Sequence, residues 1–129
     1  MSNEVQTIRA VFPQVKGIWL FGSRATGQTN CDSDLDLAVW AGASLDPVAL
    51  WNCGQRIAVD LGCAVDLVDL ACSSTIFVFQ VVKDGKRLFA SDNYECDFFE
   101  TTAISMYQRF RRERAEIVDA YVAHKRNEL

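Results

Sequence analysis

The run Gly17-Ile-Trp-Leu-Phe-Gly-Ser-Arg-Ala-Thr-Gly27 and the run Asp34-Leu-Asp-Leu-Ala-Val39 decide the fold of this chain. Residues 17–21 are rich in β-branched and aromatic side chains, which predicts a short buried strand that leads directly into a Gly-Ser turn. Residues 34–39 alternate polar and apolar side chains, which predicts a second strand with its two aspartates on one face. Together they indicate a phosphate-binding turn beside a pair of carboxylates.

The segment after these strands carries clear signals for a helix and a third strand. Asp46 is a predicted N-cap, Pro47 the first helical residue and Gly62 the C-cap. Residues 64–70 then read as a strand, and the order strand, helix, strand predicts a parallel or mixed sheet covered by helices. The other predicted elements are a short first helix capped by Ser2 or Asn3 and ended by Pro13, a helix from Ser73 or Ser74 through Val82, a turn at 83–86, a strand at 87–90 and a long helix at 97–124.

These elements predict an α/β (α+β) fold, in which a small mixed β-sheet is flanked by helices and followed by a long C-terminal helix. Residues 1–129 are within the usual size of one domain, and we find neither an internal repeat nor a linker. We therefore expect a single domain over residues 1–129.

Composition narrows the range of functions. The net charge of -4 and the acidic pI of about 4.9 argue against a broad nucleic-acid-binding or membrane-binding surface. No apolar run approaches the roughly 20 residues that a membrane-spanning helix needs. Five cysteines without a Cys-x-x-Cys pair give no support for a zinc site, and we expect them to be small core residues in the reducing cytoplasm.

The candidate site joins the Gly-Ser turn to carboxylates on two strands. Asp34 and Asp36 are spaced to bind one or two hard divalent cations, and Asp66 on the next strand is the expected third carboxylate, as ligand or base. Asp69 is the weaker alternative because it falls on the opposite strand face, and Asp32 remains open. Gly22 and Ser23 of the turn are expected to bind phosphate, and Arg24 either joins them or faces solvent.

The pattern Gly22-Ser23, ten residues, then Asp34-Leu35-Asp36 resembles the signature of nucleotidyltransferases related to DNA polymerase beta. The short chain is similar to their minimal (MNT) branch, which includes the antitoxins of HEPN/MNT toxin-antitoxin pairs. Three stretches carry this resemblance, namely residues 21–27, 33–37 and 65–70.

The resemblance implies transfer of AMP from ATP with Mg²⁺, and for the antitoxin branch transfer to a tyrosine of a partner HEPN toxin, with which the chain would form a hetero-oligomer. A second reading is transfer to a small molecule, as in the similar aminoglycoside nucleotidyltransferases. A third is a non-catalytic antitoxin that neutralises its partner by binding alone.

Two other groups of side chains have less specific explanations. The cluster Arg109, Arg111, Arg112 and Arg114 is interleaved with Glu113 and Glu116, which favours a solvated helix face over a docking surface. The aromatic residues are expected in the core rather than as base-stacking platforms, and these are Trp19, Trp51, Phe77, Phe79, Phe98 and Phe99.

Overall fold

The computed structural model describes residues 2–22 and 34–127 of the chain. Its elements follow in the order α1 (Asn3–Val11), β1 (Gly17–Phe21), β2 (Leu35–Trp40), α2 (Pro47–Leu61), β3 (Val65–Asp69), the 3-10 helix η1 (Leu70–Cys72), α3 (Thr75–Asp84), β4 (Lys86–Ala90) and α4 (Asn93–Asn127).

The four strands form one mixed sheet in the order β3-β2-β1-β4. β1 is antiparallel to both β2 and β4, whereas β2 and β3 are parallel and are connected through α2. The expected small mixed sheet with helical crossover is therefore confirmed.

Helices cover both faces of the sheet. α1 and α2 bury Ile8 and Ile57 against odd-numbered β2 residues such as Leu37. On the other face, even-numbered Ala38 lies in a cluster with Trp19 of β1 and with side chains of α3 and α4. Because neighbouring positions on a strand point to opposite faces, the even-numbered aspartate of β2 belongs to the face that carries α3 and α4.

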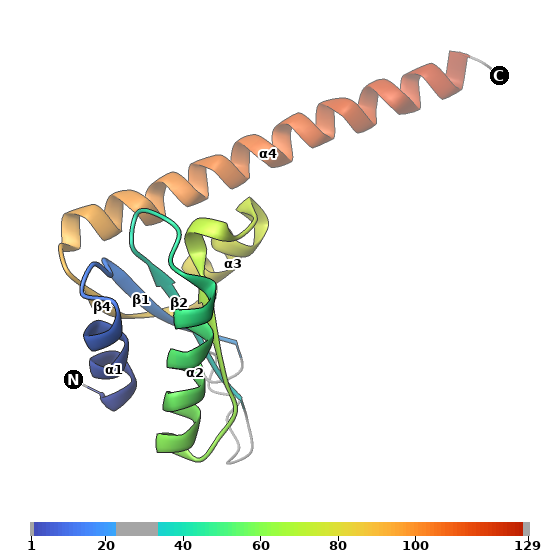
Figure 1. The fold of residues 1–129 in the computed structure, drawn as a ribbon. Coiled ribbons are helices and arrows are strands. Elements are labelled where there is room, and N and C mark those ends of the chain that lie inside the picture. Colours follow the sequence, from blue (N-terminus) through green and yellow to red (C-terminus); the bar gives the residue numbers. More distant parts are fainter. Residues whose placement is uncertain (1, 23–33, 128–129) are drawn as a thin grey trace.

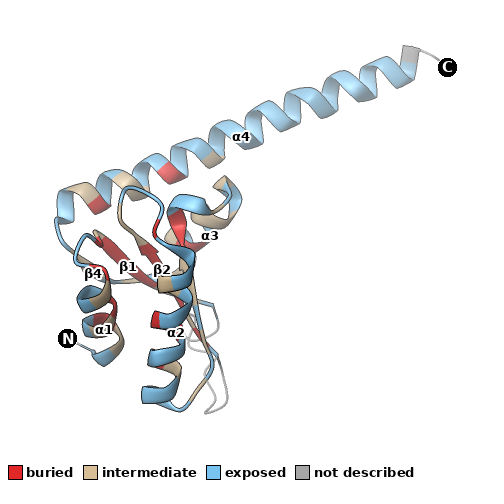
Figure 2. Ribbon diagram, in the orientation of Figure 1, coloured by how far each residue is buried: buried red, intermediate tan, exposed pale blue. Residues whose placement is uncertain are grey.

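The last helix is much longer than the body it packs on. α4 has 35 residues and crosses one end of the sheet before it continues past the remaining elements (Figure 1). Its distal half is exposed along its length, as Figure 2 shows. The apolar side chains of α4 are therefore buried only near the sheet, whereas Phe110, Ile117 and Tyr121 remain exposed.

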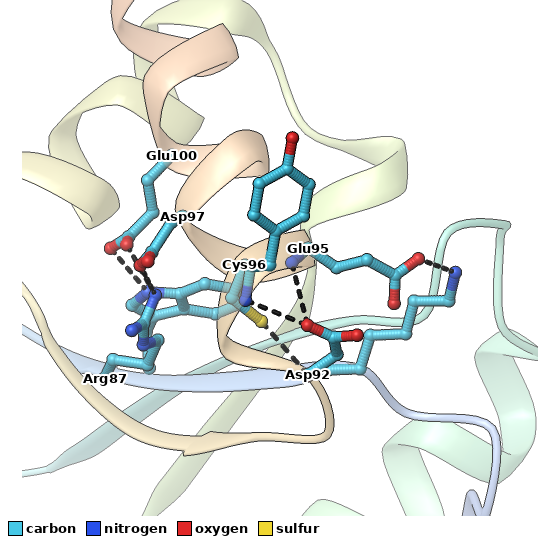
Figure 3. A network of polar contacts seen from close by, with 9 residues as sticks. Arg87, Asp92, Glu95, Cys96, Asp97 and Glu100 are labelled. Carbon is cyan, nitrogen blue, oxygen red and sulfur yellow. Dashed lines mark hydrogen bonds and ion pairs between the residues drawn. The ribbon is translucent and has the colours of Figure 1, made fainter.

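A polar cluster fixes the first turns of α4 to the sheet (Figure 3). Arg87 of β4 pairs with Asp97 at 2.9 Å and with Glu100 at 2.8 Å, both on α4. Glu100 also accepts a hydrogen bond from Nε1 of the buried Trp19 at 3.3 Å. One carboxylate thus satisfies a buried indole and a guanidinium from two different strands.

Most predicted boundaries agree with the structure to within a residue or two, and the differences have local causes. α2 begins after the Asp46 cap and ends at Gly62, as expected. α4 begins four residues earlier than predicted because Asp92 caps it, accepting from the backbone N–H of Tyr94 at 2.9 Å. α3 continues to Asp84, so the predicted turn at 83–86 is reduced to the break at Gly85.

Two aromatic residues contradict the expectation that all six lie in the core. Trp19 is fully buried, but Trp51 on α2 and Phe98 on α4 are each 66% exposed. α2 buries the stripe that contains Cys53 and Ile57, and Trp51 lies on the far side of the helix from it. Of the described cysteines, Cys53 and Cys96 are buried, whereas Cys63 is half-buried and Cys72 is exposed, so the core assignment is only partly right.

Candidate active site

The candidate site lies where β1 ends and β2 and β3 begin. Asp36 of β2 is directly opposite Asp66 of the parallel strand β3, and on its other side it is opposite Phe21 of β1. Directly opposite residues in a sheet share a face, and neighbouring strands are about 4.8 Å apart. The two carboxylates therefore project together from the face that carries α3, and Asp36 is half-buried while Asp66 is exposed.

Gly22 follows β1 and lies beside the Asp36 carboxylate. Its φ of +77° is in the left-handed region, which favours glycine. A Cβ at this position would collide with Oδ2 of Asp36. The absence of a side chain thus lets the backbone of the turn approach the Asp36 carboxylate.

Asp34 immediately precedes β2 and is exposed. It is two positions from Asp36, so in an extended backbone it points to the same side. Within the described residues, no three His, Cys, Asp or Glu side chains gather closely enough to hold a metal ion. What the structure brings together is the facing pair Asp36 and Asp66, with Asp34 two positions before Asp36 in the chain. Carboxylates supply the hard oxygen donors that Mg²⁺ prefers.

Asp69 has a different environment from Asp66. It is 7% exposed, and its carboxylate accepts hydrogen bonds from the backbone N–H of Leu45 at 2.8 Å and of Ala71 at 3.0 Å. It pairs with Val39 at the opposite end of β3, away from Asp36. The geometry thus gives Asp69 a structural task, and Asp66 is the carboxylate that lies beside Asp36.

Several predicted contacts lie outside the described residues. Ser23 and Arg24, the other members of the predicted phosphate-binding turn, are among the residues that the structure does not describe, and so is Asp32. Of the turn, the structure places Gly22 alone.

α3 borders the site through an aromatic contact that the sequence did not reveal. Phe77 meets Phe21 edge-on, with ring centroids 5.5 Å apart, and Phe21 is opposite Asp36. Phe77 and Phe21 are far apart in the chain, so no local pattern could have predicted that they meet here.

The arginine cluster of α4 faces solvent. All four arginines are exposed, and Arg109 forms an exposed ion pair with Glu113, one helical turn away, at 3.1 Å. No helix within residues 2–22 and 34–127 is long and apolar enough to cross a membrane.

Comparison with protein families identifies a match over most of the chain. Residues 3–94 match the family model described as Polymerase beta, Nucleotidyltransferase. The protein adenylyltransferase MntA of Shewanella oneidensis is 38% identical over 120 residues, which is 93% of this chain and 86% of that protein. The protein of the same name from Aphanizomenon flos-aquae is 32% identical over 98 residues, covering 68% of this chain and 65% of that protein.

Solved structures extend the likeness to the fold. A toxin–antitoxin structure with AMP-PNP contains a chain that matches with a TM-score of 0.82 and 38% identity, over 94% of this chain and 99% of that one. A complex of the tri-AMPylated HEPN toxin of Shewanella oneidensis with an MNT antitoxin contains a match with a TM-score of 0.75 and 36% identity, over 92% of each chain. The long terminal helix is therefore within the matched length.

Proposed function

This chain belongs to the Polymerase beta nucleotidyltransferase family, and we propose that it is an antitoxin that transfers AMP from ATP to a tyrosine hydroxyl of a partner HEPN toxin. The observation that carries the proposal is the facing pair Asp36 and Asp66 next to the Gly22 turn. The relatives named as protein adenylyltransferases, and the solved complex with an AMPylated HEPN toxin, support AMP as the group and a toxin as the acceptor.

Magnesium fits the donors that the chain offers. Mg²⁺ is usually held by one or two protein carboxylates together with substrate phosphates and water. Asp34 and Asp36 would hold the ion on the protein side, with Asp66 as a further ligand or as the base. When bound, the ion neutralises charge on the phosphate oxygens during displacement.

The remaining groups bind phosphate and move a proton. Gly22, Ser23 and Arg24 are assigned to the triphosphate, since backbone N–H groups, a hydroxyl and a guanidinium all donate to phosphate oxygens. The acceptor oxygen attacks the α-phosphorus, the bond from that phosphorus to its bridging oxygen breaks, and pyrophosphate leaves. Asp66 receives the hydroxyl proton.

The protein surface supports a macromolecular acceptor. Tyr121 and Ile117 on the distal part of α4 are 61% and 69% exposed, and no described element packs on them. Exposed apolar side chains grouped on one element are typical of a protein interface. We therefore propose a hetero-oligomer with the toxin, in which the whole chain, residues 1–129, acts as one nucleotidyltransferase domain.

Two alternative functions can be tested with the same proteins and labelled ATP. One is transfer to a small molecule, and the other is a non-catalytic antitoxin that neutralises by binding.

The described cysteines are free thiols, which supports a place in the reducing cytoplasm with the toxin.

The decisive experiment incubates the chain and its HEPN toxin with Mg²⁺ and ATP labelled at the α-phosphate. We expect label on a toxin tyrosine, and we expect the double variant Asp34→Asn/Asp36→Asn to transfer none while it keeps its circular dichroism spectrum. If the double variant still protects cells from the toxin, neutralisation by binding is the better account. Label that appears on a small hydroxylated acceptor and not on the toxin supports the other alternative.

A further inference from the structure

The outer edge of β3 runs past the candidate site without a neighbouring strand in the described sheet. β3 is a terminal strand, and its one partner is β2. Asp66, which lies opposite Asp36, is the second residue of this strand. An unpaired strand edge is a template for an added strand, so here the template lies directly beside the carboxylate pair.

The register shows which backbone groups face outward. Leu35 N–H donates to the carbonyl oxygen of Ala64 at 2.9 Å, and Leu35 is opposite Val65. In a parallel pair, hydrogen bonding alternates along the strand, so the amide groups of Asp66 point toward β2 while those of Val65 and Leu67 point away. A segment that bonds to Val65 and Leu67 would therefore place one residue directly opposite Asp66, with its side chain on the same face.

An apolar groove lies at the end of β3, where the strand passes into η1. Its volume is about 260 Å³, and it is lined by Leu45, Pro47, Leu50, Val68, Asp69, Cys72 and Ser73. Val68 is two residues from Asp66 along β3, a separation of roughly 7 Å in a strand. A segment paired with the edge of β3 would thus extend from the carboxylates into the groove within about three residues.

We propose that the outer edge of β3 is the binding site for the acceptor, which is an extended segment of the partner toxin that pairs with Val65 and Leu67. Its hydroxyl side chain lies opposite Asp66, and an apolar side chain within about three residues of it occupies the groove. This inference rests on the proposed function and specifies how its protein substrate is held. Main-chain pairing supplies affinity, and the groove and the Asp66 carboxylate select which segment of the toxin binds.

Pairing at this edge also explains the direction of proton transfer. The acceptor hydroxyl would come next to the exposed Asp66, while Asp36 is half-buried behind the Gly22 turn. As the acceptor oxygen bonds to the α-phosphorus of ATP and pyrophosphate leaves, the hydroxyl proton passes to Asp66. The exposed Asp66 would thus take the acceptor proton, whereas the half-buried Asp36 would hold the metal ion.

Leu67→Pro tests the backbone pairing, and Leu67→Ala is its matched control. Both variants lose the leucine side chain, but only proline removes the outward N–H, and proline is tolerated on edge strands. The substrate is a toxin peptide of roughly nine residues around the labelled tyrosine. We expect Leu67→Pro to raise the KM for this peptide about fivefold to tenfold over Leu67→Ala, with the affinity for ATP unchanged.

Cys72 provides a second measurement that does not depend on catalysis or on the proline variant. This exposed groove residue can be alkylated with N-ethylmaleimide in a Cys31→Ser/Cys63→Ser background, since Cys53 and Cys96 are buried. We expect the peptide, without ATP, to slow alkylation, and a peptide with its neighbouring apolar residues changed to serine to give no protection.

The results separate failure of this inference from failure of the proposed function. If the wild-type protein labels the toxin, but the peptide leaves alkylation unchanged and Leu67→Pro behaves as Leu67→Ala does, the edge site is wrong and the activity stands. If Leu67→Pro does not fold, the alkylation result decides. If protection occurs without any AMP transfer, the edge binds the segment and the proposed function fails.

Discussion

Asp36 of β2 and Asp66 of β3 are directly opposite each other in the register of these two parallel strands. Like charges placed directly opposite each other in a sheet are destabilising, so this pair is less favourable for the fold than a pair with one neutral member. That cost indicates a functional arrangement rather than one that stabilises the fold.

Replacing Asp66 of this pair should lower activity without lowering stability. We expect Asp66→Asn to lower the rate of AMP transfer by roughly 10²- to 10⁴-fold, because an amide cannot take the acceptor proton. The free energy of unfolding should stay the same or rise by about 0.2–1 kcal/mol, since the repulsion is relieved. Single-turnover labelling and urea unfolding measure the two quantities. An active Asp66→Asn protein would remove Asp66 from the mechanism.

Asp69 is the matched contrast, because it is the same residue type on the same strand. Asp69→Ala leaves the N–H groups of Leu45 and Ala71 without their carboxylate acceptor. We expect a loss of about 2–4 kcal/mol of unfolding free energy, with AMP transfer retained per folded molecule. Urea unfolding and labelling normalised to the folded fraction test this. Full stability with lost transfer would reverse the roles of the two aspartates.

Gly22→Ala and Gly42→Ala separate backbone strain from damage to the site. Both glycines have a left-handed φ, of 77° and 81°, so alanine should cost each about 1–2 kcal/mol. At Gly42 the atoms nearest to the added Cβ belong to the flexible side chain of Lys16, the first at 3.5 Å, whereas at Gly22 the added Cβ collides with Asp36. We therefore expect comparable losses in thermal stability but a fall in AMP transfer for Gly22→Ala alone.

Equal transfer rates for the two glycine variants, measured below their melting temperatures, would show that Asp36 adjusts without consequence. The affinity for ATP measured in the same samples tells whether the turn has also lost its phosphate contact.

Sequence patterns predicted the elements whose signals are local. Asp46, Pro47 and Gly62 fixed both ends of α2, because a cap and a helix breaker act within one turn. Alternation along each strand likewise predicted that Asp36 would share a face with Asp34, and it preferred Asp66 to Asp69. The register then added the one fact that alternation lacks, namely which residue of β3 lies opposite Asp36.

What the sequence could not predict depends on contacts between distant segments. Trp51 is apolar and lies in a helical pattern, but which stripe of α2 is buried depends on how the helix rests on the sheet. Phe77 likewise reaches the site only through the packing of α3 against β1. The unequal burial of α4 is a third example, since its apolar stripe continues beyond the end of the sheet.

Glu100 should contribute far more to stability than its neighbour Asp97, although both pair with Arg87. Glu100→Ala leaves the buried Trp19 indole N–H without its acceptor, which costs about 1–3 kcal/mol. Asp97 is largely exposed, and surface ion pairs are worth about 0–1 kcal/mol. Urea unfolding of Asp97→Ala and Glu100→Ala compares them. Equal effects would mean that the Trp19 contact contributes nothing.

The buried thiols predict a loss of stability in alkali. Burial raises the pKa of Cys53, with a smaller opposing effect of Arg56, and burial likewise raises the pKa of Cys96. In the unfolded chain, thiols lose their protons near their usual pKa of about 8.5, whereas in the folded protein these two keep them to a higher pH. The unfolded state therefore binds fewer protons, so the free energy of unfolding falls as the pH rises above that value.

Urea unfolding at about pH 7.5 and about pH 10 measures this fall, with the other titrating groups common to all variants. The double variant Cys53→Ala/Cys96→Ala should be less stable at the lower pH, because it leaves small cavities, yet it should lose less stability between the two pH values than the wild type. Cys72→Ala is the control and should reproduce the wild-type difference, since it leaves both buried thiols in place. If the double variant and the wild type lose the same amount, the two thiols ionise in the folded core as readily as in the unfolded chain, and their burial has no effect on the alkaline limit.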